Sequence, residues 1–155
     1  MIRSIIRILF CLFLIAGIAF FRFAEPADIV DGFSNVVEFL GKSQLTSEYK
    51  LIGERYDEKD DYTGCYKCTA DDETGQDVIY GGCSISDIDL KIKGKVETTS
   101  GDLKIRIRCG SDVYEIDIDE NGLFEDKIEF NGGGSYVMIQ YEHFSGNIDL
   151  KTEYA

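Results

Sequence analysis

The chain has 155 residues, which is enough for one ordinary domain with a short appendage. It carries 29 Asp and Glu against 16 Lys and Arg, and three of the arginines precede Glu25, so the part from Glu25 onward has a net charge of 13 − 29 = −16. A surface with this charge repels nucleic-acid phosphates, which argues against nucleic-acid binding.

The N-terminal segment has the pattern of a membrane anchor. Residues 8–21 form an unbroken apolar run, and Arg3 and Arg7 precede it. Positive residues before an apolar run favour a cytoplasmic N-terminus. Residues 1–25 are therefore predicted to be a cytoplasmic tip and a single transmembrane anchor, which contacts the membrane through residues 8–24 and leaves the rest of the chain outside the cytoplasm.

A cleaved signal segment is the alternative for the same residues. Gly17 and Ala19 provide small side chains at the spacing that cleavage requires, and the protein would then be secreted. A cut there would leave a mature chain that begins with apolar residues, which favours the uncleaved anchor.

A short amphipathic helix is predicted next, within a segment of helix and linker over residues 26–47. Pro26 suits the first turn of a helix, and Gly41 suits its C-terminal stop. Between them, apolar residues recur at helical spacing, at Ile29, Val30, Phe33, Val36, Val37 and Leu40.

Residues 48–155 are predicted to form a mainly β domain, an antiparallel β-sandwich of about eight or nine short strands. The first strand is expected over residues 48–55. The strongest pattern lies in residues 87–119, where apolar and charged residues alternate as they do in strands with one buried face. The apolar positions are Ile88, Leu90, Ile92 and Val96, then Leu103, Ile105, Ile107 and Cys109, then Tyr114, Ile116 and Ile118.

Two tight turns within this stretch predict strand pairing. A two-residue turn at Gly110–Ser111 sets Ile107 opposite Tyr114 on the inner face. On the outer face, the same register places opposite charges together, with Arg106 against Glu115 and Lys104 against Asp117.

A second hairpin turn, at Ser100–Gly101, would bring like charges together. It would place Lys95 opposite Arg106 and Lys93 opposite Arg108, and like charges directly opposite one another destabilise a sheet. Either neighbouring acids neutralise these residues, or a crossover places the two strands in different sheets, or the four residues bind an anionic ligand such as a wall polymer or a lipid headgroup.

Four cysteines follow the apolar segment: Cys65, Cys68, Cys83 and Cys109. An even number of cysteines in an extracytoplasmic domain predicts two disulfides. Cys65 and Cys68 are three apart on a predicted strand and so face opposite sides, which predicts that they pair with Cys83 and Cys109 rather than with each other. The spacing does not favour a zinc site or a redox dithiol at a helix N-terminus.

One segment matches the beginning of a calcium-binding loop, with Asp117, Asp119 and Asn121 as the ligand positions. The twelfth position of such a loop should be acidic, but it is Ile128. The preferred interpretation is a hairpin loop over residues 120–122 with its glycine in the left-handed conformation. No metal or other cofactor is therefore predicted.

Nothing in the sequence indicates catalysis, since the single histidine and the absence of a G-x-S-x-G motif leave no recognisable catalytic group. We therefore expect a non-catalytic binding or interaction module on the outer face of a cell membrane, whose partner is a protein or an anionic surface ligand. The alternatives are a thiol–disulfide oxidoreductase that uses Cys65 and Cys68, and a degenerate calcium-binding β domain.

Overall fold

The structure is a computed structural model that describes residues 44–155, apart from the side chain of Ile85. The predicted anchor and the predicted amphipathic helix lie outside these residues. Within residues 44–155, no helix has the length and apolar character needed to cross a membrane.

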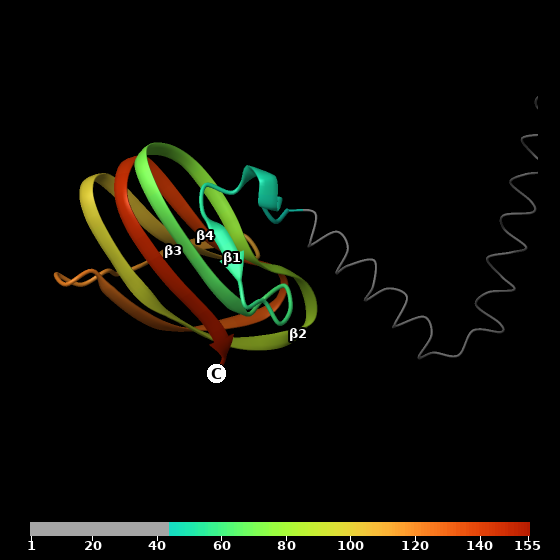
Figure 1. Ribbon diagram of the computed structural model, residues 1–155. Helices are drawn as coiled ribbons and strands as arrows, with labels where there is room; N and C mark the ends of the chain where they lie inside the picture. The colour runs from blue at the N-terminus through green and yellow to red at the C-terminus, as the bar shows by residue number, and fades with distance from the viewer. Residues whose placement is uncertain (1–43) are drawn as a thin grey trace, which may run out of the picture. The chain divides into compact units, whose positions relative to one another are not determined.

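The described chain is mainly β, as the alternating pattern predicts, and its strands form one antiparallel sheet (Figure 1). The expected series of short strands is replaced by fewer and much longer ones, since β2 has 46 residues and β4 has 32. The elements are the 3-10 helix η1 (Glu48–Lys50) and the strands β1 (Glu54–Tyr56), β2 (Gly64–Cys109), β3 (Asp112–Ile116) and β4 (Leu123–Tyr154).

The two long strands pair along two ladders. The first joins residues 64–95 of β2 to residues 123–152 of β4, and the second joins residues 90–109 of β2 to residues 135–154 of β4. Both strands bend as they run, as the curved ribbons of Figure 1 show, and shifts of register mark bends such as those between Ala70 and Glu73 and between Ser84 and Asp87. Asp72 has a φ of +58° at the first of these bends, yet β2 continues through it, so strands expected to be separate are continuous.

The buried face of this sheet agrees with the alternation in the sequence. Leu90, Ile92, Ile105 and Ile107 are fully buried, and β4 contributes Ile128, Val137 and Ile139 to the same core. Each such side chain stabilises the fold by about 1.5–3 kcal/mol through the apolar surface that it removes from water.

The hairpin predicted at Gly110–Ser111 is confirmed, because Ile107 pairs with Tyr114 and Arg106 pairs with Glu115. Two details of that prediction are wrong. Tyr114 remains 40% exposed because β3 lies at the end of the sheet, and β3 ends at Ile116, so that Lys104 contacts Glu115 at 3.5 Å instead of facing Asp117.

The pairing predicted across Ser100–Gly101 is wrong. Lys93 and Lys95 have neighbours on β4 on both sides, whereas Arg106 and Arg108 lie between β4 and β3. The two runs therefore follow one another along the same ladder with β4 instead of pairing with each other, and the expected opposition of like charges does not occur.

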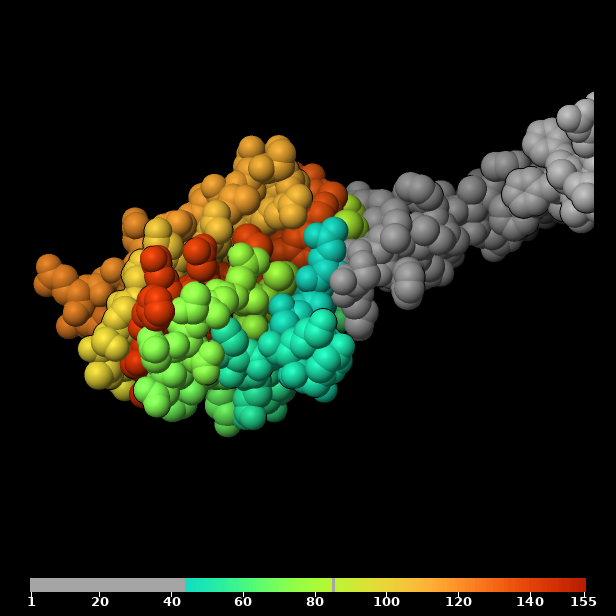
Figure 2. Space-filling model, turned by 90° about the horizontal axis from the view of Figure 1, so that it is seen from above, coloured from blue at the N-terminus to red at the C-terminus, as the bar shows by residue number. Residues whose placement is uncertain are grey.

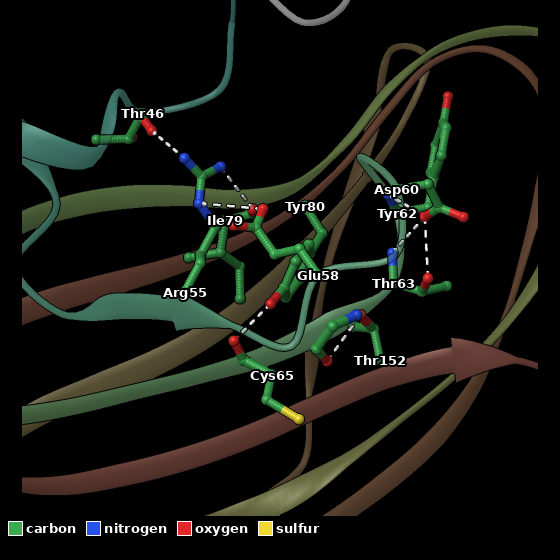
Figure 3. A network of polar contacts seen from close by, with 11 residues as sticks. Thr46, Arg55, Glu58, Asp60, Tyr62, Thr63, Cys65, Ile79, Tyr80 and Thr152 are labelled. Atoms are coloured by element: carbon green, nitrogen blue, oxygen red, sulfur yellow. Dashed lines mark hydrogen bonds and ion pairs between the residues drawn. The ribbon is translucent and has the colours of Figure 1, made fainter.

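The first described residues also differ from expectation, because residues 48–55 are not one strand. They contain η1, a bend and only the beginning of β1. The guanidinium of Arg55 ties this segment to β2 by donating hydrogen bonds to the carbonyls of Thr46 (3.1 Å) and Ile79 (3.2 Å), as Figure 3 shows. Figure 2 shows the segment, in cyan, against the green part of β2.

Candidate functional site

An open groove of about 560 Å³ lies over β1, β2 and β4 where the short strand β1 begins. Its walls are mostly polar, and it is lined by Ile52, Gly53, Glu54, Lys67, Cys68, Thr69, Lys95, Glu97, Asn147, Ile148 and Asp149. A hollow of this volume is within the range of small-molecule sites.

Two rows of polar side chains cross the groove. In the first row, Asp149 of β4 is the register partner of both Lys67 and Lys95, and residues directly opposite one another share a face of the sheet. The second row has Asn147 between Thr69 and Glu97. Each row therefore presents three side chains from three neighbouring stretches of strand.

The charges in the groove are largely matched. Lys67 Nζ lies 2.8 Å from Glu54 Oε1, and Lys95 Nζ lies 2.6 Å from Glu97 Oε1. Asp149 lies between the two lysines in register. Because these pairs are exposed to water, they add little to stability, and their side chains can exchange partners when a ligand binds.

In the second row, the Thr69 hydroxyl donates to the Asn147 side-chain oxygen at 2.8 Å. This leaves the Asn147 amide group as a donor in addition to the lysines. The groove therefore offers hydrogen-bond donors and acceptors within a few ångströms of one another.

A buried carboxylate beneath the groove explains its shape. Asp77 is fully buried and accepts hydrogen bonds from the backbone N–H groups of Ile52 (3.0 and 3.2 Å) and Gly53 (3.3 Å). These two amides turn inward to Asp77, so β1 does not extend along β2 before Glu54. The edge of β2 beyond Lys67 consequently remains open, and the groove lies there.

Two tyrosines complete the hydrogen bonding around Asp77. The Tyr66 hydroxyl donates to Asp77 Oδ2 at 2.5 Å, lies 2.7 Å from the Tyr141 hydroxyl and accepts from Gly53 N at 2.9 Å. Burial raises the pKa of both tyrosines well above the ordinary value, so both stay neutral. A buried carboxylate with this many donors is satisfied, as a structural group should be.

The cysteines do not form the two predicted disulfides, because all four thiols are free in the structure. The register places the predicted partners at different positions along β4. Cys65 and Cys68 are opposite Lys151 and Ile148, whereas Cys83 and Cys109 are opposite Gly134 and Ser135.

The prediction that Cys65 and Cys68 face opposite sides agrees with their burial, since Cys68 is buried and Cys65 is half-buried. Cys68 lies near Tyr141, and burial raises its thiol pKa. Cys109 pairs with Ser135, six residues from Tyr141 along β4 or about 20 Å in an extended strand, so Cys68 and Cys109 cannot be bridged.

The calcium-like segment forms a tight turn, but the prediction of a hairpin is wrong, because the strands that it joins, β3 and β4, both pair with β2 and not with each other. Asp119 N donates to Leu123 O at 2.9 Å, and Gly122 has a φ of +78°. The Asp119 carboxylate accepts from the backbone of Leu123 (2.7 Å) and Asn121 (2.8 Å), and these bonds lower its pKa. In the part of the chain that the structure describes, no group of three or more His, Cys, Asp or Glu side chains, Asp117 and Asp119 among them, is placed to hold a metal ion.

The four basic residues predicted as a ligand site have different neighbours. Lys93 contacts Glu153 at 2.9 Å, and Lys95 belongs to the groove. Further along β2, Arg106 donates to Gln140 at 3.0 Å, and Arg108 donates to the carbonyl of Gly110 at 2.9 Å. Only Lys95 of this set therefore lines the groove.

Sequence reasoning missed the groove and the buried network beneath it. Asp77 is opposite the fully buried Ile139, so alternation along residues 76–80 could have placed its carboxylate on the inner face. Asn147 and Asp149 gave no such signal, because the residues beside which they line the groove are some 80 and 50 positions away in the chain. Among known proteins, no family model and no curated sequence matches the chain.

Proposed function

We propose that this protein is a non-catalytic binding module held at the outer face of a cell membrane, and that the groove over β1, β2 and β4 is its ligand site. The observation that carries the proposal is the pair of polar rows, Lys67–Asp149–Lys95 and Thr69–Asn147–Glu97, at the floor of an open groove. The buried groups around Asp77 have their hydrogen bonds within the fold, so they support the groove rather than react.

The ligand class follows from the charges. Three carboxylates and two ammonium groups line the groove, so a simple anion would meet more repulsion than attraction. Alternating donors and acceptors suit a neutral ligand with many hydroxyl groups, such as a surface saccharide. This choice revises the anionic ligand expected from Lys93, Lys95, Arg106 and Arg108.

A binding experiment with matched polymers tests the proposal. The full-length chain is titrated with soluble neutral glycans, with dextran and dextran sulfate included as neutral and anionic probes. A variant with Asn147→Ala and Asp149→Ala should lose at least about tenfold in affinity for the neutral glycan that binds best, because two hydrogen-bonding side chains are removed. The control is Lys127→Ala, which breaks an exposed ion pair with Asp89 (3.2 Å) outside the groove and should bind normally.

Three results would contradict this function: no glycan binds, dextran sulfate alone binds, or Lys127→Ala weakens binding as much as the groove variant. A glycan that is cleaved during the titration would contradict the non-catalytic part of the proposal.

The topology of the protein is part of the proposal. The positive residues before the apolar run support a cytoplasmic N-terminus with residues 48–155 outside. Resistance of the protein to alkaline extraction from membranes, together with an intact N-terminus, is the expected result. A mature chain that starts near Phe20 and washes off membranes would instead indicate secretion.

A finer description of the fold is also proposed, in which the bent sheet folds over on itself into the two layers of a β-sandwich. The core supports it, because buried side chains from either side of the bend at Ser100–Gly101, such as Ile92 and Ile107, belong to one cluster. An experimental structure in which these two side chains lie in a single sheet that does not fold over on itself would contradict it.

The thiol–disulfide oxidoreductase is less well supported than the binding module. Cys65 and Cys68 point to opposite faces, and burial raises the pKa of the Cys68 thiol, which opposes formation of the reactive thiolate. Alkylation of the folded protein should therefore leave Cys68 as the slowest of the four thiols. A readily reduced Cys65–Cys68 bond, detected by mass spectrometry with and without reductant, would favour the enzyme.

A further inference from the structure

β3 is an edge strand whose outer side has no strand beside it within residues 44–155. The strand order ends at β3, which pairs with β2 alone. Four of its five residues are exposed, among them Val113 (44% exposed) and Tyr114. Such an edge presents backbone groups with which another extended chain can pair.

The register identifies which backbone groups of β3 point outward. Cys109 and Asp112 close the two-residue turn and so exchange hydrogen bonds, and in an antiparallel ladder such pairs alternate with pairs that do not. The N–H and C=O groups of Asp112, Tyr114 and Ile116 therefore point toward β2, and those of Val113 and Glu115 point away from the sheet.

An acidic hollow of about 660 Å³ begins at the C-terminal end of β3. Its walls carry six carboxylates, those of Glu97, Asp102, Glu115, Asp117, Asp119 and Glu120, against the two cations Lys95 and Lys104. Lys95 contacts Glu97 (2.6 Å) and Lys104 contacts Glu115 (3.5 Å), so four carboxylates remain in excess of cations.

We infer that the edge of β3 binds an extended, lysine- or arginine-bearing peptide segment. The peptide adds a strand to the sheet by hydrogen bonding to the outward groups of Val113 and Glu115. Its basic side chains continue past Ile116 into the acidic hollow, where four excess carboxylates complement them. The hollow borders the groove, since Lys95 and Glu97 line both, but neither β3 nor the loop after it is part of the groove, so the inference does not depend on the saccharide proposal.

A second copy of this chain fits the edge less well. Pairing two five-residue edges buries much less than the roughly 1,200 Å² of total surface that stable interfaces need. Two copies would also each carry the net charge of −16 on the part from Glu25 onward and would repel one another. A basic peptide is instead attracted to the acidic protein.

Fluorescence anisotropy with two labelled probes tests the inference on the full-length chain in neutral detergent at low salt. The probes are the ten-residue peptides (Lys-Thr)5 and (Glu-Thr)5. The lysine peptide should bind and the glutamate peptide should not. Val113→Pro removes an outward N–H that β2 does not use, and it should weaken binding of the lysine peptide about tenfold. Val113→Thr keeps that N–H and should bind like the wild type.

The acidic hollow has its own variant, Asp117→Asn with Glu120→Gln. It should weaken binding of the lysine peptide and make that binding less sensitive to salt. Asp119 is left unchanged because its carboxylate holds the loop backbone.

Hydrogen exchange of the wild type tests whether the lysine peptide pairs with β3 even if Val113→Pro fails to fold. On addition of the lysine peptide, exchange should slow at the amides of Val113 and Glu115, and much less at Tyr114, which is already bonded to β2. Unchanged exchange at Val113 and Glu115 would overturn the inference. It would also be overturned by equal binding of the glutamate peptide, or by folded Val113→Pro that binds with wild-type affinity.

Discussion

Replacing Asp77 should destabilise the fold more than replacing either tyrosine beside it. The carboxylate is fully buried and accepts hydrogen bonds from Ile52 N, Gly53 N and Tyr66 Oη. In Asp77→Ala, three charge-assisted bonds of about 2 kcal/mol each are lost, roughly 6 kcal/mol in total. Removing the buried charge also removes its desolvation penalty of several kcal/mol. The free energy of unfolding should therefore fall by about 3 kcal/mol in total.

The two tyrosines supply a graded comparison. Tyr66→Phe removes one hydrogen bond to Asp77 and one to Tyr141, but Gly53 N still donates to Asp77. The free energy of unfolding should therefore fall by about 2 kcal/mol. Tyr141→Phe removes only the bond between the two hydroxyl groups, so it should cost about 1 kcal/mol.

Equilibrium urea unfolding of the full-length chain, followed by far-UV circular dichroism, measures the three free energies of unfolding. Faster hydrogen exchange at the Ile52 amide in Asp77→Ala would show that the inward turn beside β1 has been released. The reasoning is refuted if Tyr141→Phe costs as much as Asp77→Ala, or if Asp77→Ala costs less than about 1 kcal/mol.

Two further predictions concern an ion-paired carboxylate and a glycine. Glu153 accepts from Lys151 (2.6 Å) and Lys93 (2.9 Å), and these hydrogen bonds lower its pKa to about 2, from the ordinary 4.5. Its contribution to stability is therefore complete above pH 4.5 and is lost as the pH falls toward 2. Replacing both lysines by Gln should raise the pKa of Glu153 toward 4.5 in a carbon-13 NMR titration, and an unchanged pKa would contradict the assigned cause. Gly122→Ala should lower stability by at least twice the roughly 1 kcal/mol expected for Gly110→Ala. Both glycines have positive φ, +78° and +61°, but of the two only Gly122 has a backbone atom, the carbonyl oxygen of Val96, in the place that a Cβ would take. Equal urea midpoints for the two variants would show that this close approach is relieved at no cost.

The sequence alone determined the β class of the domain, much of its core and one hairpin. Alternation is a local property of the backbone, because successive side chains in a strand face opposite sides wherever the strand lies. Leu90, Ile92, Ile105 and Ile107 could therefore be placed in the core without knowledge of their neighbours. The Gly110–Ser111 turn fixed the pairing of Ile107 with Tyr114 because a two-residue loop leaves one register.

Tertiary structure alone decided which strands lie side by side across long separations. At Ser100–Gly101 the sequence allowed a hairpin, but in the structure both runs pair with β4, one after the other along the same ladder. The separation of the cysteines and the rows of the groove follow from their register with β4. The Asp77 network depends on the inward turn at Ile52, which no local pattern predicts. Pairing between distant strands is set by the total burial and hydrogen bonding of the whole sheet, and no local pattern encodes it.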